Sequence, residues 1–186
     1  HPGTWPARLD FLPCFCYDKP HERTGTYKMD LHFEPITDDN RERALKLHIS
    51  PTQKGYVETV EECLEEASHG RNWQPVGIYD GPVMVGFAMY GFFWWPYLPL
   101  GRLWLDRLLI DETFQGRGYG SAALSGLLDR LQQEYRCRRI YLSVIRENST
   151  AITMYEKFGF RFTGERDIHG EHVMVYHTQQ QGAGSR

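Results

Sequence analysis

The sequence lacks any hydrophobic run long enough to cross a membrane. Its 186 residues contain no apolar segment near the roughly 20 residues that a membrane helix requires. The most apolar stretch, residues 92–97, is short and is interrupted by Pro96. A signal peptide is not expected either, because the first residues lack a basic start, an apolar core and a cleavage site of small residues. These absences predict a globular protein without a membrane segment.

Cysteine is scarce, and its spacing excludes the usual zinc motifs. Cys14 and Cys16 are too close together for an easy disulfide, and no C-x-x-C pair occurs with spaced histidines. Cys63 and Cys137 lie at apolar positions typical of small core residues in a reducing compartment. We therefore expect a cytoplasmic protein without a metal. Three histidines lack metal-ligand spacing and are assigned structural or solvent-facing positions: His48, His169 and His172.

The chain also lacks an excess of positive charge. It has 21 Lys and Arg against 24 Asp and Glu, a formal net charge of −3 at pH 7. No basic patch typical of nucleic-acid binding is evident, so no nucleic-acid partner is expected. A mildly acidic protein suits a small cationic ligand, although this charge balance is also common among proteins in general.

Apolar periodicity predicts one domain over residues 29–178, because neither an internal repeat nor a linker divides it. Residues 1–28 follow no period and are interpreted as an irregular N-terminal extension, translated from sequence upstream of a start at Met29. The alternative is an arm that packs on a partner. Residues 179–186 are interpreted as a polar tail. The predicted strands are 31–36, 75–79, 83–92, 103–110, 139–144, 160–163 and 172–177, and the predicted helices are 37–49, 57–67, 121–135 and 150–158.

The most informative segment is the turn QGRGYG at residues 115–120, between a predicted strand and a predicted helix. Its glycines allow the backbone to approach a ligand closely, and amide N–H groups at a helix N-terminus favour an anion. Arg117 adds a cation that can pair with phosphate. The turn therefore suits a pyrophosphate, although an ordinary glycine-rich turn is the alternative because a short glycine motif is weak evidence.

A second segment, ENSTAITMYEKFGF at residues 147–160, follows the next predicted strand. Together the two segments resemble the GNAT superfamily of acyl-CoA N-acyltransferases. That family has a Q/R-x-x-G-x-G/A loop for the CoA pyrophosphate and an N-x-x-A-x-x-x-Y-x-x-x-G-F segment at the next helix. The resemblance implies an α+β fold with a mixed, mostly antiparallel sheet of about seven strands flanked by about four helices.

The likeness extends to the bacterial spermine/spermidine acetyltransferases of the Blt type and covers about residues 29–177. It implies acetyl-CoA as the acetyl donor and a primary amine of spermidine or spermine as the acceptor. Direct attack in a ternary complex is expected, because no well-placed cysteine favours a covalent acetyl-enzyme. A homodimer is the family expectation. The alternatives are another small amine or a peptide N-terminus as acceptor, or a non-catalytic CoA-binding regulatory module. The segments that carry the likeness are 37–41, 47–50, 75–77, 85–91, 104–107 and 170–175.

The resemblance also implies which residues bind the donor. Loop amides hold the phosphates, and the main chain of the strand before the loop binds the pantetheine arm. The N–H of Leu109 is a candidate oxyanion donor. Asn148 is expected to cap the next helix and, by the resemblance, also to contact the cofactor. The full predicted set is Leu108, Leu109, Ile110, Gln115, Gly116, Arg117, Gly118, Tyr119, Gly120, Ser121 and Asn148.

Two residues are predicted to be catalytic. Tyr155 occupies the tyrosine position of the family motif, where a phenol can protonate the departing thiolate; the alternative is a packed tyrosine. Asp106 shares a strand face with Leu108 and Ile110 by period-two counting, so it could deprotonate the amine or only bind it. An ion pair between Asp106 and Arg102 is the alternative. Arg107 is assigned to the other face in a structural role.

A polyamine requires a long acidic site with aromatic walls. Glu61 and Glu62, in the middle of the second predicted helix, are the preferred carboxylates, although a charged helix face is commonly just solvated. Trp94 and Trp95 could stack on ammonium groups, or could instead form a dimer contact or a lid.

Overall fold

The computed structural model describes residues 29–49, 58–70 and 72–178. The predicted extension 1–28, the predicted tail 179–186 and the predicted helix position Val57 lie outside these residues. Cys14 and Cys16 lie outside them too. No helix in the described ranges has the length and apolar character needed to cross a membrane.

Seven strands form one sheet in the order β1-β2-β3-β4-β5-β7-β6. Neighbouring strands run antiparallel except β4 and β5, which are parallel. The predicted fold class is therefore confirmed, and the predicted strands are all present. The strands are β1 (Leu31–Pro35), β2 (Trp73–Asp80), β3 (Val83–Phe93), β4 (Arg102–Ile110), β5 (Arg139–Val144), β6 (Arg161–Arg166) and β7 (His172–His177).

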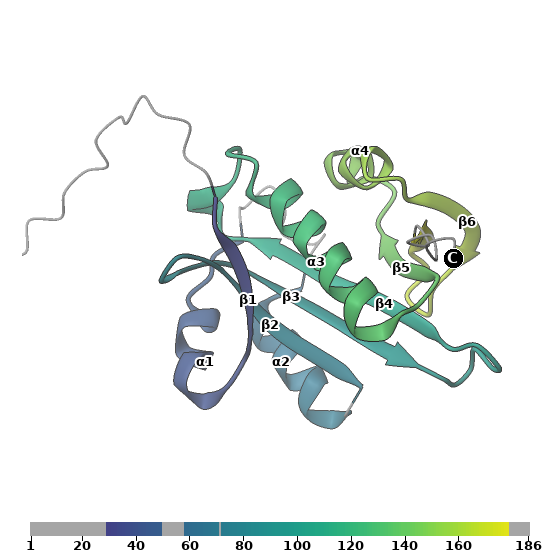
Figure 1. The fold of residues 1–186 in the computed structure, drawn as a ribbon, viewed down its shortest axis with the longest axis horizontal. Helices are drawn as coiled ribbons and strands as arrows, with labels where there is room; N and C mark the ends of the chain where they lie inside the picture. Colours follow the sequence, from purple (N-terminus) through teal and green to yellow (C-terminus); the bar gives the residue numbers. More distant parts are fainter. Residues whose placement is uncertain (1–28, 50–57, 71, 179–186) are drawn as a thin grey trace, which may run out of the picture.

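Helices cover both faces of the sheet (Figure 1). Helices α1 (Asp38–Leu45) and α2 (Val60–His69) pack on one face through a core that includes Ala44, Cys63 and Leu64. Helices α3 (Tyr119–Tyr135) and α4 (Ser149–Lys157) pack on the other face. The inward-facing residues predicted for α3 are all buried there: Ala123, Leu124, Leu127, Leu128 and Leu131.

Strand β4 contains a β-bulge at Asp106. In its register with β3, Leu105 opposes Tyr90 and Arg107 opposes Met89, so Asp106 is the extra residue. Leu105 lies on the α3 side of the sheet before the bulge, and Leu108 lies on that side after it. The prediction that Asp106 shares a face with Leu108 and Ile110 assumed a regular strand in which alternate residues share a face. The bulge breaks this alternation at residue 106, so the count is wrong there.

The parallel pairing of β4 with β5 is very short. It consists of Leu103 with Ile140 and Trp104 with Tyr141, at the beginning of both strands. Beyond these pairs β4 stays on β3 and β5 stays on β7, so the two strands diverge within the sheet. The resulting gap opens toward the glycine turn that follows β4.

A buried carboxylate fixes the segment after α1 at the end of β4. Asp111 accepts hydrogen bonds from the N–H of His48 (2.8 Å) and from the N–H (2.9 Å) and hydroxyl (2.6 Å) of Thr113. Burial opposes ionisation of Asp111, but the bonds from Thr113 and His48 outweigh it and lower the pKa of the carboxyl. Thr113 belongs to the short 3-10 helix η2 (Glu112–Phe114), which the sequence pattern did not predict.

We expect Asp111→Asn to lower the free energy of unfolding by about 1–3 kcal/mol at pH 7. A carboxyl whose pKa is lower in the folded state stabilises the protein above its unfolded-state pKa, and this contribution is lost as pH falls through the folded-state pKa. The difference between wild type and variant should therefore shrink in acid. Urea unfolding at pH 7 and near pH 3 measures this stability difference. The control is Glu112→Gln, which changes an exposed neighbouring residue. Equal stabilities for wild type and Asp111→Asn at pH 7 would contradict this role.

Candidate active site

A cavity of about 1190 Å³ occupies the gap between β4 and β5 and extends to the glycine turn, α2 and α4. It brings residues from six separate segments of the chain to one place. Predicted site residues that line it are Glu61, Glu62, Asp106, Leu108, Ile110, Gln115, Gly116, Gly120, Asn148 and Tyr155. Those that do not are Leu109, Arg117, Gly118, Tyr119, Ser121, Trp94 and Trp95.

The glycine turn adopts a conformation that requires glycine at two positions. Gly116 has φ +72° and Gly118, the N-cap of α3, has φ +87°, both in the left-handed region. The first intrahelical bond runs from the Ala122 N–H to the Gly118 carbonyl, so the N–H groups of Gly120 and Ser121 have no acceptor within the helix. The turn therefore directs amide dipoles to the mouth of the cavity.

Two side chains fasten this turn to the sheet. Gln115 donates from Nε2 to the carbonyl of Ile110 at 2.8 Å, which joins the turn to the end of β4. The Tyr119 side chain is buried, and its hydroxyl donates to Asp80 at 2.6 Å. The Tyr119 side chain thus supports the turn from the core instead of lining the cavity.

The backbone of β4 presents Leu108 and Ile110, not Leu109, to the gap. The Asp111 N–H donates to Val85 on the β3 side at 3.0 Å. Because N–H groups alternate sides along an antiparallel strand, that of Leu109 points to β3 as well. The Leu109 side chain is buried in the α1–α2 core. The assignment of Leu109 as oxyanion donor is therefore wrong, and the main-chain groups of Leu108 and Ile110 face the gap.

Helix α4 brings Asn148 and Tyr155 to the opposite wall. Asn148 is its N-cap, and Oδ1 accepts from the Ala151 N–H at 3.2 Å, as the capping prediction requires. Tyr155 packs on Phe160 with ring centroids 5.7 Å apart. Burial, with a smaller contribution from Glu171, raises the pKa of Tyr155 to about 12. The phenol is therefore protonated at neutral pH and can donate a proton.

Asp106 pairs with its neighbour Arg107. Arg107 Nη1 lies 2.7 Å from Asp106 Oδ2, an ion-pair contact whose angle does not suit a hydrogen bond. Arg107 also contacts Glu58, with Nε 3.1 Å from Oε2. Arg102 instead binds Glu165 through two hydrogen bonds of 2.6 and 3.0 Å. The ion pair between Asp106 and Arg102, which was the alternative to a catalytic role for Asp106, is therefore wrong.

The surroundings of Asp106 disfavour its charged form. Burial is the largest effect, and with the carboxylates of Glu66, Glu58 and Glu171 it outweighs the opposing charge of Arg107, so the pKa rises to about 6. Such a carboxyl is ionised at neutral pH but can take up a proton readily. This is the property expected of a general base near pH 7.

The lining of the cavity is acidic. Among the described residues it includes six carboxylates but one guanidinium, that of Arg107. Glu62 is engaged in a capping box: its carboxylate accepts from the N–H and hydroxyl of Thr59, both at 2.8 Å, and these bonds lower its pKa. The other lining carboxylates are Glu58, Glu61, Asp106, Glu112 and Glu171.

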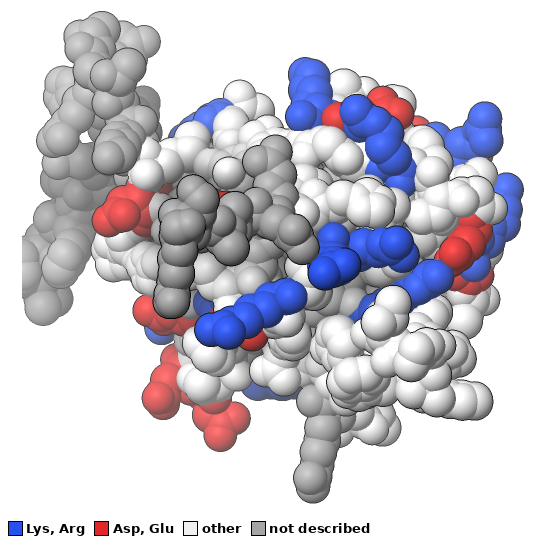
Figure 2. All heavy atoms as spheres, turned by 45° about the vertical axis from the view of Figure 1, so that its right-hand side comes forward, with Lys and Arg blue, Asp and Glu red and all other residues white. Residues whose placement is uncertain are grey.

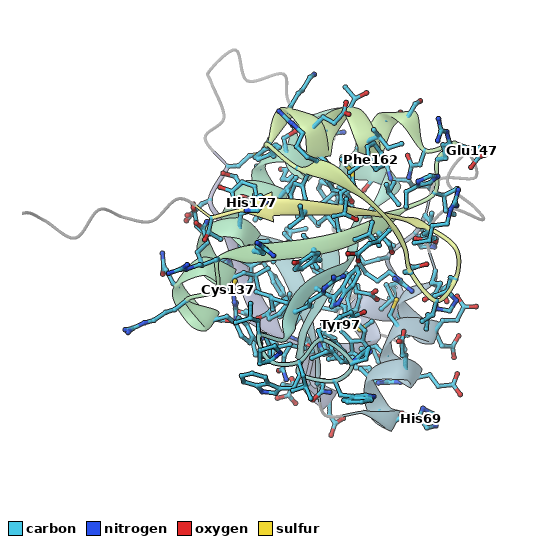
Figure 3. The ribbon with its side chains drawn as sticks, turned by 90° about the vertical axis from the view of Figure 1, so that its right-hand side faces the viewer. His69, Tyr97, Cys137, Glu147, Phe162 and His177 are labelled. Atoms are coloured by element: carbon cyan, nitrogen blue, oxygen red, sulfur yellow. The ribbon has the colours of Figure 1, made fainter. Side chains whose placement is uncertain are left out.

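The predicted aromatic wall lies elsewhere. Trp94 and Trp95 are 59% and 77% exposed in the β3–β4 hairpin. Neither side chain lines the cavity. Figure 2 shows an uncharged projection at the lower right of its face, in keeping with the uncharged residues 94–101. In Figure 3, Tyr97 of this hairpin lies below the C-terminal strands, whereas Glu147, beside Asn148, lies at the upper right.

The residue patterns did not identify Glu171 or Arg107 as site residues. Glu171 follows Gly170 in the turn between β6 and β7, where no periodicity indicates the direction of a side chain. Arg107 follows the bulge, which a single strand does not reveal. Across the described ranges, no group of three or more His, Cys, Asp and Glu residues is arranged to hold a metal ion.

Comparison with known proteins identifies the family. The acetyltransferase (GNAT) family model matches residues 37–160. A spermine/spermidine N(1)-acetyltransferase of Bacillus subtilis is 46% identical over 151 residues, which cover 79% of this chain and 98% of that protein.

Solved structures share the fold at low sequence identity. The spermidine N-acetyltransferase of Vibrio cholerae, crystallised with CoA and spermine, has a TM-score of 0.59 at 18% identity and covers 79% of this chain and 95% of its own. The aminoglycoside acetyltransferase AAC(6')-Ib with coenzyme A has a TM-score of 0.66 at 20% identity, covering 79% of this chain and 94% of its own. The family model and the Bacillus relative together establish that this chain belongs to the GNAT family of acetyltransferases.

Proposed function

We propose that this protein transfers an acetyl group from acetyl-CoA to a primary amine of spermidine or spermine. The observation that carries the proposal is the gap between β4 and β5, with a helix N-terminus at one mouth and acidic side chains along the remainder. The Bacillus relative, named for the same two amines, supports the choice of acceptor.

The residues present fit CoA. A Cβ built at Gly116 would meet nothing within 4 Å, and one at Gly120 would meet only the side chains of Met154 (3.6 Å) and Ile110 (3.9 Å). The turn therefore leaves room for a diphosphate against its amides. Main-chain groups of Leu108 and Ile110 face the gap, where they would bind the amides of a pantetheine arm in the manner of a neighbouring strand. Acetyl-CoA supplies the thioester that makes acetyl transfer favourable.

Asp106 is the proposed base. A primary ammonium has a pKa near ~10, so it must lose a proton before its nitrogen can attack. Asp106 lines the same cavity as Tyr155 and the β4 main chain. Its carboxylate takes the proton from the ammonium, directly or through a water, and the amine lone pair then forms the bond to the acetyl carbon.

Tyr155 is the proposed acid. As the carbon–sulfur bond breaks, the Tyr155 hydroxyl donates its proton to the departing thiolate. Main-chain N–H groups of Leu108 or Ile110 are placed to stabilise negative charge on the acetyl oxygen. The nitrogen loses a second proton as the amide forms, and this proton restores the Tyr155 hydroxyl. Overall the acceptor nitrogen gains an acetyl group, CoA leaves as a thiol, and the proton taken up by Asp106 is released.

Direct transfer agrees with the state of the cysteines. Neither Cys63 nor Cys137 lines the cavity in the described part of the chain. Burial raises the pKa of Cys63 to about 12 and also raises that of Cys137, so neither thiol is activated as a nucleophile. An acetyl-cysteine route therefore has no support from these two residues.

An acceptor panel tests the substrate class. We expect kcat/KM for spermidine and spermine to exceed that for a monoamine of similar length by at least about tenfold, because extra ammonium groups contact the acidic lining. Release of free CoA thiol measures the rates, with an amine-free reaction as the control. An equal kcat/KM for a monoamine would refute the polyamine assignment. No release of CoA thiol with any amine would refute the assignment as an enzyme.

For Asp106→Asn we expect a large loss of kcat/KM for the amine, with acetyl-CoA affinity within about twofold. The acid limb of the wild-type pH profile, near pH 6, should disappear.

Asp106→Asn should also change stability. Because folding raises the pKa of Asp106, its ionised form costs stability at pH 7, and the cost is relieved as pH falls below 6. The variant should therefore be more stable at pH 7, on the order of 1–3 kcal/mol. Asp129→Asn, on the exposed side of α3, is the control; unchanged amine kinetics across pH would refute the role of Asp106.

Tyr155→Phe should lower kcat on the order of 10- to 100-fold while CoA affinity, measured by calorimetry, changes little. The matched control is Tyr176→Phe, since Tyr176 packs on the same Phe160 at 5.5 Å but lies outside the cavity lining. If both variants retain wild-type kcat, Tyr155 is a packing residue only.

A further inference from the structure

Three of the six cavity carboxylates already have protein partners. Glu58 and Asp106 are paired with Arg107, and Glu62 is bonded to Thr59. Within the described residues, Glu61, Glu112 and Glu171 have no hydrogen bond or ion pair to their side chains, and Glu61 and Glu112 are well exposed. Glu171 is half-buried, so its carboxylate has lost part of its water without gaining a cation.

We propose that Glu171 is a specificity-determining residue for the acceptor, whose carboxylate binds an ammonium group at the reacting end of the cavity together with Asp106. This inference rests on the proposed function and deepens it by naming a contact. The ammonium would supply the missing partner of Glu171 and would lie where Asp106 can take its proton.

The turn that carries Glu171 is held by several hydrogen bonds. Asp167 Oδ1 accepts from the N–H of His169 (2.9 Å) and of Glu171 (2.8 Å), and the Asp167 N–H donates to the Glu171 carbonyl (3.0 Å). Arg166 donates from Nη1 to the carbonyl of Gly170 at 2.6 Å, and Gly170 has φ +82°. These bonds use the main chain of Glu171 and fix the backbone of the turn, whereas its side chain lines the cavity.

Glu171 lines the same cavity as both catalytic candidates, which come from opposite walls. Its charge contributes to the raised pKa of Asp106 and of Tyr155. Glu171 also lies where the cavity adjoins a smaller hollow of about 310 Å³, since it lines both together with Ile145. An ammonium bound at this junction would have space for its methylene chain on more than one side.

The same arrangement predicts an effect on pH dependence. The charged groups that face Asp106 are Arg107 on β4, Glu58 before α2, Glu66 on α2, and Glu171. Removing the charge of Glu171 removes one of the causes that raise the pKa of Asp106. The acid limb of kcat/KM for the amine should then move to lower pH in Glu171→Gln, because Asp106 stays ionised in more acidic solution.

The test compares Glu171→Gln, Glu171→Asp and wild type with spermidine as the acceptor. We expect Glu171→Gln to raise KM for spermidine about tenfold or more, with CoA affinity and the thermal unfolding midpoint unchanged, because the turn is held by main-chain groups. Glu171→Asp keeps the charge and should restore a large part of the affinity. Calorimetric titration of spermidine into the CoA-bound protein should show the same order.

Glu147→Gln is the matched control. Glu147 lines the smaller hollow but not the main cavity, so its removal reports the effect of net charge alone. An unchanged KM and acid limb in Glu171→Gln, or equal changes in Glu147→Gln, would overturn the inference while an active wild-type enzyme leaves the acetyltransferase assignment intact. A wild type that acetylates no amine would instead refute the proposed function, and this contact with it.

Discussion

The site depends on one constraint: β4 and β5 must separate while each keeps its other neighbour. Two residue pairs hold the strands together at Leu103 and Trp104, and after that the antiparallel pairings with β3 and β7 carry the strands apart. Backbone groups on the inner edges of the gap are then left without a neighbouring strand, although buried polar groups require partners. An extended ligand with amide groups is a natural partner there, and α3 and α4 lie on one face of the sheet near the gap (Figure 1).

The bulge in β4 places charge inside this gap at a cost. A carboxylate with little access to water is unfavourable, and a paired guanidinium only partly offsets its desolvation. Arg107 therefore acts as a shared counter-ion, since it contacts Asp106 from the same strand and Glu58 from the segment before α2. The net charge of the cavity lining remains negative, and a bound cation would reduce it. Local instability of this kind is typical of catalytic sites.

Local signals made much of the fold predictable from the sequence. The left-handed conformations at Gly116 and Gly118 follow from residue type, and the Asn148 cap needs only its own helix. Features that depend on two strands at once were not predictable: the bulge at Asp106 exists only relative to β3, and with it the pairing with Arg107 instead of Arg102. Trp94 and Trp95 were assigned to the acceptor site from residue type, which does not place the β3–β4 hairpin relative to the cavity.

Opposite charges along one cavity also determine the order of the reactants within it. In the proposed reaction the ammonium groups of the acceptor are attracted to the donor's phosphates as well as to carboxylates, so a site that mixed the two would hold donor and acceptor in unproductive contact. Here the amides of the α3 N-terminus lie at one mouth, close in sequence to the exposed Glu112, whereas Glu58, Glu61 and Glu171 come from the α2 region and from the β6–β7 turn. The neutral main chain of Leu108 and Ile110 lies between them. In the proposed reaction, Asp106 and Tyr155 line the part of the cavity where the two ligands would meet and where proton transfer is needed.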